Sequence, residues 1–96
     1  PYDTMYDPST VPIAPSVDPA REEYAAIREM HAIYYGMISL VDDCLGRILD
    51  ALDRLGLTEN TVVVFTTDHG DMIGHHGLWS KWALYDDDAR LPFIIR

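Results

Sequence analysis

The feature that most constrains the fold of this chain is one long helical pattern. From Tyr24 to Leu55, apolar and aromatic residues recur at alternating spacings of three and four, and His31 is the one exception. Further apolar residues widen the stripe on one flank, which is typical of a helix covered by neighbours. With Pro19 in its first turn and Gly56 as its stop, the pattern predicts a helix over residues 19–56, about 55 Å long.

Two residues of this predicted helix carry chemically versatile side chains. His31 falls on the apolar stripe, so an interior or boundary histidine with satisfied hydrogen bonds is favoured over a catalytic one. Cys44 is the single cysteine, which excludes an internal disulfide. No activating partner is evident around it, so we interpret Cys44 as a buried structural thiol.

The remaining segments predict short strands and loops. Residues 1–18 contain four of the six prolines and predict an extended surface segment. Residues 61–66 are β-branched and continuously apolar, as in a strand buried on both faces of a parallel sheet. After this strand we expect a polar, Gly-rich loop over 67–80, a short helix near 81–87 and a second strand over 91–96. One helix and two strands cannot cover each other, so we expect either a homo-oligomer or a larger surrounding α/β sheet.

Composition excludes some functions. The net charge of −9 argues against nucleic acid as a partner, because phosphate contacts require clustered Lys and Arg. Acidity gathers only at Asp86–Asp88, which we interpret as a solvated loop or helix end. No apolar run approaches the ~20 residues of a membrane-spanning segment.

The two ends of the chain indicate a piece of a longer polypeptide. It begins with proline rather than methionine, and its last residues look like the middle of a strand. The compartment is therefore left open.

The transition from the first strand into its loop contains the most informative residues. Asp68, His69 and Gly70 follow the apolar run directly, and open α/β sheets place ligands at the carboxyl ends of their strands. A carboxylate and an imidazole can share one divalent cation. The carboxylate suits Ca²⁺, Mg²⁺ or Mn²⁺, whereas imidazole favours Mn²⁺, Fe²⁺ or Zn²⁺.

A second interpretation makes a self-contained zinc site from nearby residues, namely His69, Asp71, His75 and His76. Their spacing matches no compact zinc pattern, and two adjacent histidines do not easily face one ion, so we disfavour it. Three aromatic residues downstream fit packing roles better than the lining of a substrate entrance; they are Trp79, Trp82 and Tyr85.

Several motifs in order resemble the sulfatases of the alkaline phosphatase superfamily, especially bacterial arylsulfatase, choline-sulfatase and phosphonate monoester hydrolase-like members. The matching segments are DDCLGRILDAL (42–52), NTVVVFTTDHGD (60–71), GHHGL (74–78), Lys81 and RLPFIIR (90–96). The resemblance implies an α/β fold, an alkaline-phosphatase-like sandwich with a mainly parallel central sheet. This chain would supply one long helix and two strands of it, as part of the catalytic domain.

The same resemblance implies roles for four residues. Asp68 and His69 align with a pair of metal ligands, and Lys81 aligns with the lysine that contacts the sulfate oxygens. A cation there is physically sensible, because negative charge must be held while the S–O bond breaks. His76 aligns with a histidine expected beside the site, in a catalytic rather than a ligand role. The implied cofactor is a divalent metal, with Ca²⁺ preferred and Mn²⁺ or Mg²⁺ as alternatives.

The family nucleophile has no match in this chain. It is a formylglycine made from Cys or Ser in a Cys/Ser-x-Pro/Ala-x-Arg motif, and Cys44 is followed by Leu45-Gly46-Arg47. We therefore expect the formylglycine upstream of this chain and expect the isolated chain to be inactive. His75 and Thr67 depart from the usual acidic residue and Ser, but neither change removes a ligand.

Three functional hypotheses remain at this stage. The first is part of a sulfatase that hydrolyses small-molecule sulfate esters in the bacterial cytoplasm or periplasm. The second is a phosphonate monoester or phosphodiester hydrolase of the same superfamily. The third is a non-catalytic oligomerising module, in which Asp68→Ala and Lys81→Ala would be harmless.

Overall fold

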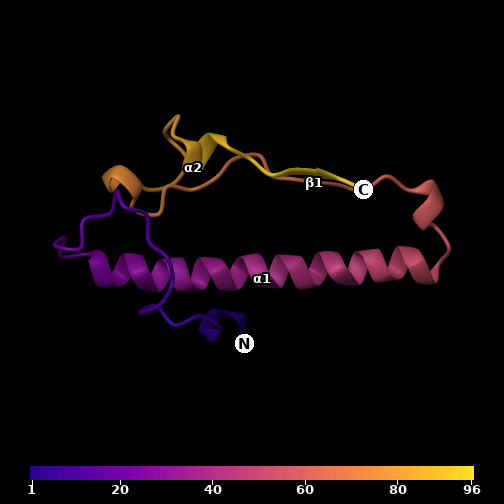
Figure 1. Cartoon of the computed structure of the whole chain (residues 1–96), viewed down its shortest axis with the longest axis horizontal. Coiled ribbons are helices and arrows are strands. Elements are labelled where there is room, and N and C mark those ends of the chain that lie inside the picture. Colours follow the sequence, from indigo (N-terminus) through magenta and orange to yellow (C-terminus); the bar gives the residue numbers. More distant parts are fainter.

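A computed structural model describes all residues from Pro1 to Arg96, and one helix dominates it. Helix α1 (Tyr24–Arg54) runs along the 54 Å axis of the molecule. The chain then turns back and runs antiparallel to α1 through strand β1 (Val64–Thr66). Near the short helix α2 (Asp86–Ala89) it reverses again, so that strand β2 (Phe93–Ile95) runs back alongside β1 (Figure 1). The elements thus form two layers, with α1 in one and the returning chain in the other.

Helix α1 begins later than the sequence pattern predicts. The carboxylate of Asp18 accepts a hydrogen bond from the backbone N–H of Ala20 at 2.8 Å, and its carbonyl accepts one from Arg21 at 3.2 Å. These bonds form a turn of their own, so Pro19 precedes the helix instead of starting it.

The end of α1 follows the prediction closely. Gly56 has a φ of 66°, a left-handed conformation that suits glycine. The N–H groups of Gly56 and Leu57 donate to the carbonyls of Asp53 and Leu52, at 3.1 and 3.0 Å. This is the paired closure of a Schellman motif, which stops the helix.

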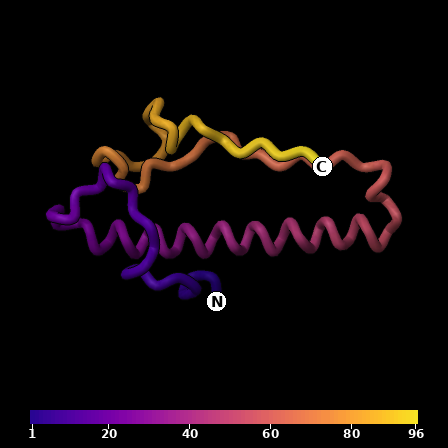
Figure 2. The backbone as a smooth tube through the Cα atoms, viewed as in Figure 1, coloured from indigo at the N-terminus to yellow at the C-terminus, as the bar shows by residue number.

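The buried core lies at the N-terminal end of α1. Here the helix, the N-terminal segment and the loop after β1 meet, and Ile27 and Met72 become fully inaccessible. Figure 2 shows the N-terminal segment crossing α1 on its way from one side to the other. Where the first residues of the chain contact α1, a Cβ on Gly36 would lie only 1.9 Å from the carbonyl oxygen of Tyr2, so only glycine fits. The other buried apolar residues are Val11, Val17, Ala32 and Ile73.

The two strands form an antiparallel ribbon in which Phe65 is opposite Ile94. Two further backbone bonds between Val63 and Arg96, at 2.9 and 3.0 Å, extend it. A mainly parallel sheet can include such an antiparallel pair, but β1 has no parallel neighbour in this chain. Burial of the first strand on both faces is also absent here, because Val64 remains half exposed.

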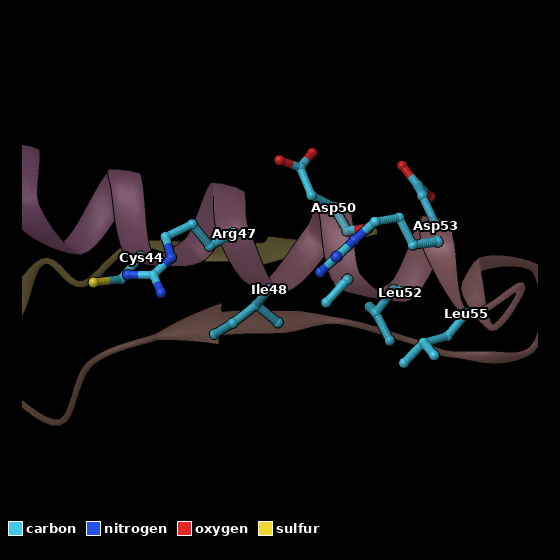
Figure 3. A pocket seen from close by; sticks show the side chains of 9 residues that line it. Cys44, Arg47, Ile48, Asp50, Leu52, Asp53 and Leu55 are labelled. Carbon is cyan, nitrogen blue, oxygen red and sulfur yellow. The ribbon is translucent and has the colours of Figure 1, made fainter.

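The C-terminal half of α1 presents side chains to the surface. Figure 3 shows an open depression along it, with Ile48, Leu52 and Leu55 pointing to one side and two aspartates to the other. Cys44 lines this depression and is exposed, so the predicted buried thiol is wrong for this chain. No neighbouring element covers its flank of the helix.

An apolar cleft separates the middle of α1 from the ribbon. Its volume is about 440 Å³, and Phe65 and Ile94 line it from the side of the strands.

No helix is both long and apolar enough to cross a membrane.

Candidate active site

The predicted metal ligand Asp68 lies just beyond the end of β1, with its side chain 82% exposed. Its carboxylate accepts a hydrogen bond from the backbone N–H of His69 at 3.1 Å. The pKa of Asp68 is lowered, chiefly by a hydrogen bond from its own backbone N–H and further by the hydrogen bond from the His69 backbone N–H and the charge of Lys81. The carboxylate is therefore ionised over the whole neutral range and available to a cation.

His69 has a defined orientation. Its Nδ1 lies 2.7 Å from the carbonyl oxygen of Gly70, which can only accept, so Nδ1 carries the proton. The lone pair is then on Nε2, which lies 2.9 Å from Nζ of Lys81 and 3.5 Å from Oδ2 of Asp68. Three of the predicted site residues are thus brought together, and the two predicted ligand atoms are neighbours.

Lys81 reaches this position because the intervening loop folds back on itself. Oδ1 of Asp71 accepts hydrogen bonds from the backbone N–H groups of Ile73 and Ser80, at 3.1 and 3.2 Å. The N–H of Met72 also donates to the carbonyl of Ser80 at 3.1 Å. Asp71 and Ser80 therefore close the loop at its base, and Lys81 follows directly.

The chemistry of these groups fits one side of a metal site. Histidines that bind metals usually donate their other ring N–H to a carbonyl or carboxylate, as His69 does to Gly70. The chain contains no group of three or more potential ligand side chains, and a hard cation takes about six oxygen ligands or more. Asp68 and His69 could therefore hold a metal only together with ligands from outside this chain.

The remaining histidines have other partners. Nδ1 of His75 lies 2.8 Å from Oδ1 of Asp87, and the His76 ring stacks on Tyr85 with centroids 4.2 Å apart. His69, His75 and His76 therefore contact three different groups, and the alternative zinc set is not assembled. No hydrogen bond or ion pair joins His76 to Asp68, His69 or Lys81, so its predicted place beside the site stays a prediction.

His31 is a satisfied boundary histidine, as its position on the stripe predicts. Its Nε2 lies 3.1 Å from the carbonyl oxygen of Ile73, and its ring is 6.0 Å from that of His75. The pKa of His31 is lowered, mainly by partial burial, which outweighs the opposing hydrogen bond to Ile73.

The acidic triplet contains the residue that the sequence interpretation missed. Asp86 and Asp87 are exposed, as predicted for a solvated segment, but Asp88 is only 5% exposed. Its Oδ2 accepts a hydrogen bond from the N–H of Ala83 at 3.0 Å, and its carbonyl accepts one from Gly70 at 2.9 Å. The local sequence gives no signal for this burial, because it depends on two distant loops meeting.

The packing role predicted for the aromatic residues is met by only one of them. Tyr85 stacks on His76, but none of the three is buried in this chain: Trp79, Trp82 and Tyr85 are 41%, 86% and 45% exposed.

Comparisons with known proteins identify the family. The sequence model of the sulfatase family matches residues 3–96. The chain is 38% identical to the ulvan-active sulfatase of Formosa agariphila, over 99% of this chain and 19% of that protein. It is 43% identical to the arylsulfatase of Clostridium perfringens, over 73% of this chain and 15% of that protein.

A solved structure shares the fold. The phosphonate monoester hydrolase of Silicibacter pomeroyi superposes on the whole chain with a TM-score of 0.86 and 30% identity. The match covers 25% of that structure, so the chain corresponds to one quarter of an alkaline-phosphatase-like hydrolase. The fold class predicted from the sequence is confirmed by this likeness.

The family model thus covers the whole candidate site, including Asp68, His69 and Lys81, together with the flanking helix and strands. The chain belongs to the sulfatase family.

Proposed function

We propose that this chain supplies half of the active site of a hydrolase that cleaves sulfate esters. The observation that carries the proposal is the contact of Lys81 Nζ with His69 Nε2 at 2.9 Å, beside the Asp68 carboxylate. An ammonium group, a carboxylate and an imidazole lone pair share one exposed place at the end of β1. This is a suitable surface for an anion held against a metal.

In the proposed reaction, Lys81 binds the oxygens of the sulfate group. Negative charge builds on these oxygens and on the leaving alcohol as the S–O bond breaks, and a fixed cation lowers the energy of that state. Asp68 and His69 would hold the divalent metal, which would supply further positive charge to the same oxygens. Ca²⁺ is our first choice because Asp68 is an ionised oxygen ligand, and Mn²⁺ or Mg²⁺ are the alternatives.

The two ring nitrogens of His69 have separate roles in this proposal. Its lone pair accepts a hydrogen bond from Lys81 in the chain as described. Nε2 is the ring atom that would hold the metal, and the ammonium group of Lys81 lies 2.9 Å from it, where it can bind the oxygens of the substrate. The hydrogen bond from Nδ1 to Gly70 would meanwhile keep the imidazole in the required tautomer.

The other parts of the site are expected outside this chain. The chain spans 12–19% of the curated relatives that it matches most strongly, so a nucleophile and further metal ligands have room elsewhere. We propose a formylglycine as the nucleophile and expect the isolated chain to be inactive. His76, held against Tyr85, is proposed to lie beside the site without binding the metal.

A phosphonate monoester hydrolase is the second candidate. The observation in its favour is the TM-score of 0.86 to an enzyme of that name. Both substrates present a tetrahedral anion, which Lys81 and a metal could hold in the same way.

A direct comparison of substrates tests the proposal. The full-length polypeptide, loaded with metal, is assayed for kcat/KM with 4-nitrophenyl sulfate and with a 4-nitrophenyl phosphonate ester. We expect the sulfate ester to be the better substrate. A thousandfold preference for the phosphonate ester would replace the first candidate with the second, and activity toward neither would leave the non-catalytic module as the better interpretation.

A further inference from the structure

Lys81 and His69 belong to segments that need an external support to stay together. Lys81 is exposed and His69 is half-buried, and Asp71 closes the loop between them at Ser80 but makes no hydrogen bond to the residues after Ser80. The distance of 2.9 Å between Nζ and Nε2 therefore depends on whatever fixes the backbone next to each residue. On the side of His69 that backbone includes Gly70. On the side of Lys81 it includes Ser80, which Asp71 holds, and Ala83.

Asp88 contacts both of these places. Its main-chain oxygen accepts the N–H of Gly70 at 2.9 Å, and its side-chain Oδ2 accepts the N–H of Ala83 at 3.0 Å. Gly70 is adjacent to His69, and Ala83 is two residues from Lys81. A single residue of α2 thus joins the segment that bears the ligands to the segment that bears the lysine.

The packing around this junction leaves little freedom. A Cβ on Gly70 would lie 1.8 Å from the carbonyl oxygen of Asp87, so the backbone of α2 presses directly on Gly70. The adjacent His75–Asp87 contact at 2.8 Å ties a further part of the loop to α2. The segment around Ala83 is held to α2 by the side chain of Asp88.

The burial of Asp88 is not explained by stability. Its second oxygen, Oδ1, is buried without a hydrogen-bond partner in this chain, an arrangement that disfavours the folded state. Its neighbours Asp86 and Asp87 avoid this cost by remaining exposed. The bond to Ala83 is the specific interaction that Asp88 gains in return.

We infer that Asp88 is a positioning residue, which sets the place of Lys81 relative to Asp68 and His69 by holding Ala83 and Gly70 together. This inference rests on the proposed function, in which Lys81 binds the sulfate oxygens. Asp88 itself touches neither substrate nor metal and acts only through Lys81.

A double-mutant cycle in the full-length polypeptide tests the inference. The kcat/KM for 4-nitrophenyl sulfate is measured for the wild type, Asp88→Ala, Lys81→Ala and the double variant. Loss of the Ala83 bond lets Lys81 move, and a displacement of about 1 Å can cost up to about 100-fold, so we expect Asp88→Ala to lose tenfold or more. Once Lys81 is absent, the same change should cost less than about twofold, because there is no ammonium group left to position.

Two variants separate positioning from charge and folding. Asp88→Asn keeps an acceptor for the Ala83 N–H, so we expect kcat/KM within about threefold of the wild type. Asp86→Ala removes an equal charge from the same short helix, where the side chain makes no hydrogen bond, and serves as the matched control. If Asp88→Ala does not fold, a folded Asp88→Asn variant that loses more than tenfold overturns the inference.

The outcomes also distinguish this inference from the function on which it rests. If Lys81→Ala retains wild-type activity, the proposed role of Lys81 fails and the inference fails with it. If Lys81→Ala loses activity strongly but the two losses multiply in the double variant, the function stands and the positioning role of Asp88 is overturned.

Discussion

The two halves of helix α1 differ sharply in what they contact. All three of its buried residues, Ile27, Ala32 and Gly36, lie in the first half, where the N-terminal segment and the site-bearing loop pack on the helix. Arg28 adds side-chain hydrogen bonds to the carbonyls of Pro8 and Val11. In the second half no residue is buried, and Ile48 is 56% exposed.

The two halves of the molecule therefore differ in whether their structure is supported from within the chain. The loops that carry the candidate chemistry are held by contacts within the chain, chiefly hydrogen bonds to Asp71 and Asp88, and both Met72 and Ile27 are fully buried there. The second half of α1 and the ribbon instead present apolar surface. We call the first half of α1, with the segments packed on it, the site half, and the second half of α1 with the ribbon the open half. Single substitutions in the site half should change activity or stability within this chain. Substitutions in the open half should change stability only where another segment covers them.

The largest expected effect is that of Lys81→Ala in the full-length polypeptide. Removal of one group that stabilises developing negative charge costs about 100-fold to 1,000-fold in kcat. Lys81 is exposed, so the melting temperature should hardly change. The matched control is Arg54→Ala in the open half, and kinetics with an aryl sulfate provide the measurement. An equal loss for Arg54→Ala would contradict the division between the halves.

The next effect compares two glycines of the same helix. A Cβ at Gly36 would meet the Tyr2 carbonyl oxygen at 1.9 Å, so Gly36→Ala should destabilise the protein by about 1–3 kcal/mol. A Cβ at Gly46 meets nothing within 4 Å, so Gly46→Ala should stabilise it by about 0.5–1 kcal/mol. Denaturant unfolding measures both. A destabilising Gly46→Ala in the full-length polypeptide would show that another segment covers the open half closely.

The smallest effect concerns pH and His31 in the site half. Because partial burial lowers its pKa below the ordinary value of 6.5, with the positive charges of His75 and Arg28 acting in the same direction, the folded state favours the neutral imidazole. This contribution to stability is complete above pH 6.5 and is lost as the pH falls through the lowered pKa. His31→Gln keeps a donor for the Ile73 carbonyl but does not titrate.

Thermal melts between neutral and mildly acidic pH check this prediction. The wild type should lose slightly more stability than His31→Gln, and the difference should be small because His31 is only partly buried. A steeper pH dependence in His31→Gln would show that the sign is wrong.

Much of the architecture could be predicted from local patterns. The three-and-four spacing identified α1, and Gly56 identified its end, because helix periodicity and a left-handed stop depend on neighbouring residues alone. The start of α1 was misplaced because the Asp18 side chain formed its own turn with Ala20, a competing use of the same residue type.

The sequence predicted the residues of the candidate site but not the residue that holds their loops in place. Asp68, His69 and Lys81 belong to motifs, and the structure brings them together. Asp88 belongs to none, and its burial arises only when residues 70 and 83 converge on α2. Cys44 could not be placed either, because exposure on a helix flank depends on neighbours distant in sequence.

The central claim is that Asp68, His69 and Lys81 form one side of a metal and sulfate site. The most direct test is a crystal structure of the full-length polypeptide grown with Ca²⁺ and inorganic sulfate. We expect a cation within about 2.6 Å of the Asp68 carboxylate, with His69 Nε2 also coordinated, and the sulfate hydrogen-bonded to Lys81 Nζ. A cation bound without Asp68 and His69, or a sulfate bound with Lys81 turned away from it, would contradict the claim.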